Sequence, residues 1–328
     1  MSEEVRLTGR PADPVDHRPR VTVDLAVDLG GVRLKNPITT ASGCFASGAE
    51  IDRFFDISDL GAVVVKSVTP EPRQGLPTPR MFETPSGMLN AIGLQNPGID
   101  RWIAKDLKFL NERKVPVIVS IAGKSVADFQ HVASRLADQH GIVAVEINLS
   151  CPNVEHRGLV FACAPGPSSE VVAAVRAELP DMPLFAKLTP DVTDITVIGQ
   201  AAVQAGATGI SAINTTLGMA IDPVTGRPRI ANTFGGLSGP AIRPIAVRAV
   251  FQLHRVLGPD VPIIGMGGIR TVEDVVEMIR AGASMVAIGT ATFADPFLSQ
   301  RLIGQLRDWC VDHGISALDE IRGKVELW

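Results

Sequence analysis

The segment 143–158, "VAVEINLSCPNVEHRG", changes from an apolar run into a cluster of side chains that could do chemistry. The polar members of this cluster are Asn148, Ser150, Cys151 and Asn153. A thiol has a reference pKa of about 8.5, so modest tuning would let Cys151 act as a general base near neutral pH. Two other interpretations stay open. Cys151 could be a small buried hydrophobic residue, and His156 could be a rival base, an activator or a surface residue.

Two lysines stand at the ends of apolar runs, where a charged side chain is costly unless it reaches solvent or meets an anion. Lys66 ends the run 61–66, and Lys187 lies near the end of the run 183–188. Both lysines could pair with a negatively charged ligand, and both could instead extend their ammonium groups into solvent.

Glycine-rich segments follow two late apolar runs. These segments are "GMGGI" at 265–269 and "IGTA" at 288–291. Glycines let backbone N–H groups approach phosphate oxygens closely. The pattern is not the G-x-G-x-x-G fingerprint of a dinucleotide-binding fold. It favours a phosphate site at the end of late strands, as in many α/β barrels.

Eight apolar, β-branched runs recur along the chain, and helix-compatible segments separate most of them. The runs are 37–42, 61–66, 116–121, 143–149, 183–188, 209–214, 262–267 and 285–290. Near-continuous hydrophobicity is typical of parallel strands that are covered on both faces. The pattern therefore predicts an α/β fold, a (β/α)8 TIM barrel, over an open doubly wound sheet.

Three further segments complete the predicted barrel. The sequence 23–37 alternates around Gly30 and Gly31, which predicts an N-terminal β-hairpin below the barrel. The long connections 67–98 and 214–240 follow the second and sixth strands. They are predicted to form long loops at the C-terminal face of the strands, where barrel enzymes build their sites. Each of the eight strands ends in small or polar residues at that face, although such residues often only make turns.

The composition excludes several classes of protein. A net charge of −4 and a pI near 5.9 give no reason to expect nucleic acid or membrane binding. The four cysteines have no metal-ligand spacing, so no metal site is predicted, and they fit reduced thiols in the cytoplasm. Residues 1–20 are predicted to be a flexible N-terminal tail rather than a signal peptide. Residues 21–328 are predicted to form a single barrel domain.

Seven motifs in order resemble the class 1 dihydroorotate dehydrogenases, and most closely the catalytic subunit of the B subclass. They are "NPITTASGCFASGAE", "SGMLNAIGLQNPG", "EINLSCPNV", "KLTPDVTDI", "GGLSGPAIRP", "IIGMGGI" and "GASMVAIGTATFADP", and they span roughly residues 22–300. The resemblance implies an FMN-binding barrel that oxidises (S)-dihydroorotate to orotate in pyrimidine biosynthesis. It implies that Cys151 removes a proton from C5 while a hydride passes from C6 to the flavin.

The resemblance also assigns roles to the other rim residues. The implied substrate-binding residues are Lys66, Asn90, Ala91, Ile92, Gly93, Leu94, Asn148, Asn153, Asn214 and Thr215. The residues implied to bind the flavin are Ser42, Lys66, Ser67, Ser120, Asn148, Lys187, Ile213 and Gly239, with Gly267, Gly268, Gly289 and Thr290 at its phosphate. Two motifs depart from the family pattern. Ser120 stands where many relatives have an asparagine, and "EHRG" replaces a common "KHGG".

The B subclass passes its electrons to a partner subunit that carries FAD and a [2Fe-2S] cluster and reduces NAD. This chain has no cysteine spacing for such a cluster and no dinucleotide fingerprint, so the resemblance implies that partner, with a homodimer core or a heterotetramer. Three alternatives stay open: a class 1A homodimer that uses fumarate, a dihydropyrimidine dehydrogenase-like flavin barrel, and a non-redox barrel enzyme that binds a phosphate ester.

Overall fold

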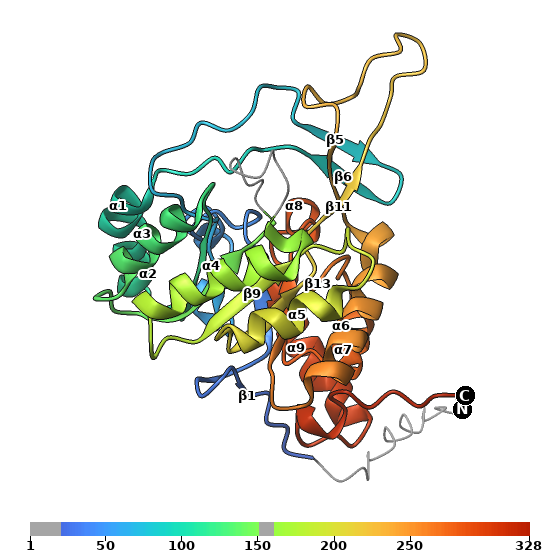
Figure 1. Cartoon of the computed structure of the whole chain (residues 1–328). Coiled ribbons are helices and arrows are strands. Elements are labelled where there is room, and N and C mark those ends of the chain that lie inside the picture. The colour runs from blue at the N-terminus through green and yellow to red at the C-terminus, as the bar shows by residue number, and fades with distance from the viewer. Residues whose placement is uncertain (1–20, 151–160) are drawn as a thin grey trace, which may run out of the picture.

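A ring of eight parallel strands forms the centre of the molecule in the computed structural model, which describes residues 21–150 and 161–328 (Figure 1). In ring order the strands are β3 (Ile38–Thr40), β14 (Met285–Ile288), β13 (Ile263–Met266), β10 (Gly209–Ala212), β9 (Leu184–Leu188), β8 (Ile142–Asn148), β7 (Val117–Ile121) and β4 (Val63–Val64). Each strand falls on one of the eight predicted apolar runs. The prediction of a (β/α)8 barrel is confirmed.

Side-chain hydroxyls close the ring between its two end strands, β3 and β4. The Thr39 hydroxyl donates to the Ala62 carbonyl at 2.8 Å. The Thr40 hydroxyl donates to the Val64 carbonyl at 3.0 Å and accepts from the Val64 N–H at 2.9 Å. These bonds satisfy buried backbone groups that a regular ladder would otherwise pair.

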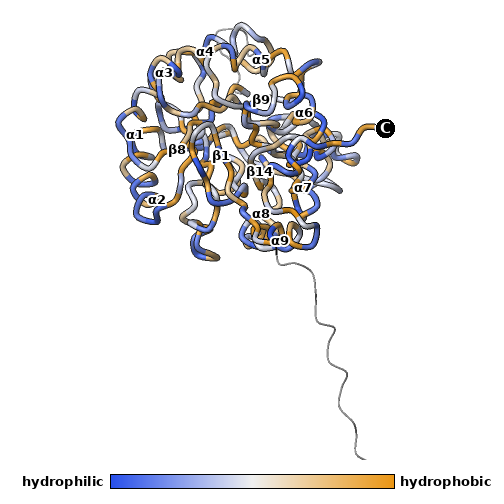
Figure 2. Tube along the Cα trace, turned by 90° about the horizontal axis from the view of Figure 1, so that it is seen from below, coloured by the Kyte–Doolittle hydropathy of each residue, from blue (hydrophilic) through white to orange (hydrophobic). Residues whose placement is uncertain are grey.

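An apolar plug fills much of the barrel interior. Its members are Ala62, Val64, Ile118, Ala144, Phe185, Ile264, Met266, Met285 and Ala287. Leu29 and Leu34 pack onto this plug from the hairpin of β1 (Val27–Asp28) and β2 (Arg33–Leu34), which turns through the positive φ angles of Gly30 and Gly31. The view from below shows β1 in the middle of the ring of helices (Figure 2). The predicted hairpin is confirmed, and it closes the bottom of the barrel.

Helices cover the outside of the ring. They are α1 (Ile99–Trp102), α2 (Lys108–Glu112), α3 (Val126–Leu136), α4 (Pro165–Glu178), α5 (Ile195–Gln204), α6 (Arg243–Leu257), α7 (Val272–Ala281), α8 (Ala291–Ala294) and α9 (Leu298–Asp312). The Ser125 hydroxyl caps α3 by accepting from the Asp128 N–H, and α7 ends at Gly282 with φ +123°. None of the described helices is long and apolar enough to cross a membrane.

The two long connections form a second, smaller sheet over the C-terminal ends of the strands. Its strands are β5 (Met81–Thr84), β6 (Gly87–Asn90), β11 (Thr216–Gly218) and β12 (Gly235–Ser238), in the antiparallel order β11-β12-β6-β5. Figure 1 shows β5, β6 and β11 above the barrel. The sequence placed both connections at the correct face but predicted loops. The pairing was missed because β12 is rich in glycine and depends on a partner more than a hundred residues away.

Candidate active site

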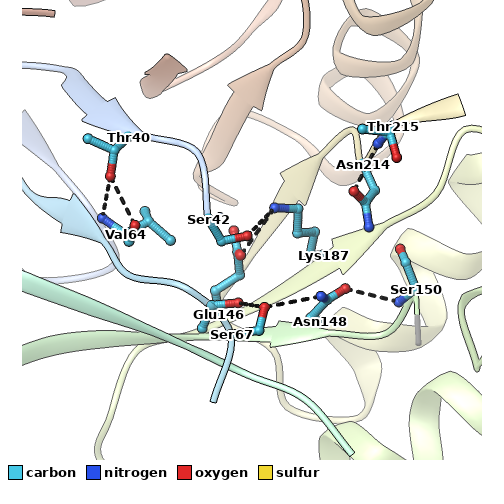
Figure 3. Close-up of polar contacts among 11 residues, drawn as sticks. Thr40, Ser42, Val64, Ser67, Glu146, Asn148, Ser150, Lys187, Asn214 and Thr215 are labelled. Carbon is cyan, nitrogen blue, oxygen red and sulfur yellow. Dashed lines mark hydrogen bonds and ion pairs between the residues drawn. The ribbon is translucent and has the colours of Figure 1, made fainter. Parts of the chain in front are cut away.

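A chain of hydrogen bonds fixes the polar side chains where β4, β7 and β8 end. The Asn148 amide donates to the Ser67 hydroxyl at 3.2 Å, and Ser67 shares a hydrogen bond of 2.8 Å with Ser120. The Asn148 side-chain oxygen Oδ1 accepts from the Ser150 N–H at 3.3 Å (Figure 3). Ser120 is fully buried. Its hydroxyl therefore supports Ser67 from below, and its direct contact with a flavin stays a prediction.

Lys187 lies on the neighbouring strand, β9, in register with Asn148. Its ammonium group donates to the Ser42 hydroxyl at 2.9 Å and lies 3.3 Å from a carboxylate oxygen of Glu146 (Figure 3). Sequence reasoning missed Glu146. Glu146 stands two residues before Asn148 in an otherwise apolar strand. Because side chains alternate along a strand, this spacing puts both side chains on the inner face, and this signal could have revealed Glu146.

Cys44 lies within range of the charges of both predicted lysines. A Cβ on the adjacent Gly43 would lie 3.2 Å from the Lys66 ammonium. A Cβ on Gly289 would lie 3.6 Å from the Cys44 sulfur. Burial raises the pKa of the Cys44 thiol from 9.0 to about 11, and the positive charges of Lys187 and Lys66 only partly oppose this shift. Cys44 is therefore a neutral thiol at physiological pH, next to the ends of β3, β4 and β14.

The raised pKa of Cys44 predicts a loss of stability at alkaline pH. An unfolded thiol ionises near pH 9 whereas the folded one holds its proton to about pH 11. The contribution of the Cys44 thiol to the free energy of unfolding is complete below pH 9. It falls by at most about 3 kcal/mol between pH 9 and pH 11. Chemical denaturation of Cys44→Ala should show a shallower decline than the native chain over this range. The exposed Cys163 provides the control, since Cys163→Ala should follow the native curve. Parallel curves for all three proteins would contradict the assignment.

Glycines from three segments come together where β13, β14 and β12 end. A Cβ on Gly268 would lie 2.9 Å from the Gly239 carbonyl oxygen and 2.8 Å from the Arg243 Cβ. Gly239, Gly267 and Gly268 all have positive φ, at +95°, +133° and +76°. The turn and loop hydrogen bonds found among the described residues include none donated by the N–H groups of Gly267, Gly268 or Gly289.

These glycines fit a phosphate group. A Cβ at Gly267 or Gly268 would strike Ala246 or the Gly239 carbonyl, so only glycine lets the backbone pack this closely, and backbone N–H groups in such turns are donors suited to an anion. Thr290 adds a hydroxyl that donates to the Ser238 hydroxyl at 2.7 Å, which links the end of β14 to β12. The structure thus brings together the four residues predicted at the phosphate and Gly239. Arg243 pairs with Asp274 directly beneath them.

Apart from Lys66 and Asn148 at the barrel strands, the described residues predicted to bind substrate lie on the small sheet and on the loops that join it to the barrel. The Asn90 amide donates to the Gly236 carbonyl at 3.2 Å, which joins β6 to β12. After β10, the Asn214 side-chain oxygen accepts from the Thr215 N–H at 2.9 Å. Ile213, beside it, is buried. Asn90, Asn214 and Thr215 therefore come from the two long connections that the sequence placed at the C-terminal face of the strands.

The segment Ala91–Leu94 has a fixed conformation that sequence reasoning did not explain. A Cβ on Gly93 would lie 2.6 Å from the Leu76 Cγ, and Leu94 has φ +55°. The buried Asn96 holds this segment, because its amide donates to the Leu94 carbonyl at 2.7 Å and to the Thr69 hydroxyl at 2.8 Å. Only tertiary context reveals Asn96, since a lone asparagine in a loop carries no specific signal.

Cys151 and Asn153 lie outside the described residues. β8 ends at Asn148, and Ser150 is the last described residue before them, at the same rim as Lys187 and Ser67. Their predicted roles stay predictions.

The fold and the rim define a barrel with a cluster of close-packed glycines at the ends of β13 and β14 and a lysine and asparagine cluster at the ends of β8 and β9. The sequence profile of dihydroorotate dehydrogenase matches residues 24–309. The chain is 48% identical over 298 residues to the "Dihydroorotate dehydrogenase B (NAD(+)), catalytic subunit" of Listeria monocytogenes, covering 91% of this chain and 97% of that protein. The equivalent protein of Geobacillus kaustophilus is 48% identical over 300 residues, covering 92% of this chain and 95% of the relative.

A solved structure of DHODH in complex with ferulenol from Eimeria tenella superposes with a TM-score of 0.77. The superposition covers 96% of this chain and 91% of the Eimeria tenella chain. The two chains are 24% identical, so this likeness supports the fold alone. The chain belongs to the dihydroorotate dehydrogenase family, and its resemblance to the B subclass is confirmed by these relatives.

Proposed function

We propose that this chain is the catalytic subunit of a B-type dihydroorotate dehydrogenase, which oxidises (S)-dihydroorotate to orotate in pyrimidine biosynthesis. The observation that carries the proposal is that the glycine cradle around Gly268 and the Lys187, Asn148 and Ser67 cluster both lie at the C-terminal ends of the same ring of strands. The 48% identity to named catalytic subunits over nine-tenths of the chain supports the same activity. Residues 21–328 form the catalytic domain in this proposal, and the cytoplasm is its location. The predicted N-terminal tail, residues 1–20, lies outside the described residues.

The proposed cofactor is FMN, which supplies the acceptor for the substrate hydride when bound. Gly267, Gly268, Gly289 and Thr290 would hold its phosphate through backbone N–H groups. Ser42, Ser67, Ile213 and Gly239 would line its ring system, and Ser120 would support Ser67. Lys187 would place a positive charge beside the ring, where a preorganised charge favours the reduced form.

The proposed substrate contacts come from amide side chains. Asn90, Asn148, Asn153 and Asn214 each offer a donor and an acceptor, which suits the ring amides and carboxylate of dihydroorotate. Thr215 and the segment Ala91–Leu94 would enclose the ring, and Lys66 would lie between substrate and flavin. Cys151 would remove the C5 proton as a general base.

The chain would pass electrons to a separate subunit that carries FAD and a [2Fe-2S] cluster and reduces NAD, in a heterotetramer built on a homodimer core. The term "catalytic subunit" in the names of the relatives supports a partner. The runner-up is direct transfer to fumarate by a homodimer of this chain.

An acceptor assay tests the proposal. The purified chain is reduced anaerobically with dihydroorotate, and fumarate, NAD and a quinone are then added in separate experiments. We expect slow reoxidation by each acceptor alone, and rapid NAD reduction once a B-type FAD/[2Fe-2S] subunit is added. Efficient turnover with fumarate by the chain alone would overturn the subclass. A chain that carries no flavin and does not oxidise dihydroorotate would overturn the activity itself.

A further inference from the structure

Glu146 is a buried carboxylate inside the barrel that the proposed function does not use. It lies on β8 with none of its surface exposed. One carboxylate oxygen is 3.3 Å from the Lys187 ammonium. The other is buried and has no hydrogen-bond partner among the described residues. Figure 3 shows the Glu146 and Lys187 side chains pointing toward each other. A carboxylate in this position requires an explanation.

The surroundings of Glu146 make its charge costly. The apolar plug begins one step below it on the same face of β8, at Ala144, and Phe185 is its register partner on β9. A carboxylate with one unsatisfied oxygen in such a place is stable only when a cation compensates it. A well-packed apolar side chain would fill the same space without this cost. The fold alone therefore does not account for glutamate at this position.

Lys187 is the group that gains from the pair. It is 3% exposed, and its ammonium group donates to the Ser42 hydroxyl at the rim as well as meeting Glu146 below. An ammonium group has three N–H donors. With one donor on Glu146 and one on Ser42, the third is available for an acceptor that is held at the rim. The contacts with Glu146 and Ser42 thus fix where the Lys187 ammonium group lies and which way it points.

We propose that Glu146 is a positioning residue that keeps Lys187 charged and fixed against Ser42, so that a positive charge meets the ring of the bound flavin. The inference rests on the proposed function, because the bound flavin is the ligand that interacts with the Lys187 charge. A desolvated lysine without a counter-ion tends to give up its proton. The other groups that face Lys187 do not replace Glu146: Cys44 holds a neutral thiol, and Lys66 carries the same charge as Lys187.

The test compares FMN binding at two pH values. The full-length apoprotein is titrated with FMN, and quenching of flavin fluorescence gives the dissociation constant at about pH 6 and about pH 9. The variants are Glu146→Gln, Lys187→Met and the double variant. The quantity compared is the ratio of the FMN dissociation constant at the higher pH to that at the lower pH. For Glu146→Gln we expect this ratio to be about tenfold larger than in the native chain, since the unpaired Lys187 loses its charge at the higher pH. Lys187→Met should bind more weakly at both pH values.

The double variant separates a positioning role from a structural one. If Glu146 acts through Lys187, adding Glu146→Gln to Lys187→Met should cause no further loss of FMN binding at either pH. A pH profile of Glu146→Gln that parallels the native one would overturn the inference. The same holds for a pH-dependent loss that persists in the double variant.

A second variant covers the case in which Glu146→Gln does not fold. Glu146→Asp keeps the charge on a shorter side chain, so it should bind FMN more weakly with the native pH ratio, and adding Lys187→Met should weaken binding no further than Lys187→Met alone. Additive losses would contradict the positioning role. A native chain that binds no FMN would instead refute the proposed function, so the two failures are distinguishable.

Discussion

Replacing Cys151 with alanine is expected to slow the reduction of bound flavin by dihydroorotate by about two to four orders of magnitude, the scale for losing a general base. Alanine cannot accept the C5 proton. The Asn148 and Ser67 side chains do not replace the thiol as a base, because an amide is not basic and the Ser67 hydroxyl already accepts a hydrogen bond from Asn148. Flavin content should stay native, because the glycine cradle proposed to hold the FMN phosphate lies at the ends of β12, β13 and β14. Anaerobic stopped-flow mixing with dihydroorotate measures the rate.

Cys163 gives the matched control for this substitution. It is an exposed cysteine that follows the same segment of the chain, in the short helical turn Phe161–Cys163. Cys163→Ala should reduce its flavin at the native rate. Reduction of Cys151→Ala at a near-native rate would exclude Cys151 as the base and would make His156 the next residue to test.

Gly268→Ala is expected to weaken FMN binding at least tenfold. Its Cβ would meet the Gly239 carbonyl oxygen at 2.9 Å and the Arg243 Cβ at 2.8 Å. The φ of +76° adds about 1–2 kcal/mol of backbone strain for a residue with a Cβ. Relief of the contact requires the Gly239 backbone or α6 to move, and both border the proposed phosphate site. Flavin content after purification and FMN titration of the apoprotein measure the effect.

Gly258→Ala is the control for backbone strain. Gly258 has φ +86° at the end of α6, and a Cβ there would meet nothing within 4 Å. This variant should lose about 1 kcal/mol of stability and keep native flavin binding. Equal loss of flavin in both variants would show that strain anywhere in the barrel, and not the cradle itself, governs retention.

The barrel could be predicted from the sequence because its strands are buried on both faces and read as continuous apolar runs. The run 116–121 and β7 (Val117–Ile121), for example, differ by one residue. The small sheet could not be predicted in the same way. β12 reads "GGLS", and its strand character comes from pairing with β6, whose backbone a Cβ on Gly235 would strike.

The rim could be located by counting strand ends, but its internal bonds could not. Lys187 and Asn148 were placed at the ends of their strands from sequence, and both lie there. That Ser120 supports Ser67 depends on the register between strands, as does the meeting of Lys187 with Glu146. A single sequence does not determine register where neighbouring strands are uniformly apolar. The role of Asn96 depends on loop conformation in the same way.

The most direct test of the proposal is an anaerobic titration of the purified chain, without any partner, with dihydroorotate. If the glycine cradle and the Lys187 rim hold flavin and substrate together, the protein should be yellow. Its visible flavin absorption should then bleach in proportion to the dihydroorotate added, with orotate as the product. A chain that neither purifies with flavin nor takes up FMN, or whose flavin stays oxidised in excess dihydroorotate, would contradict the proposal.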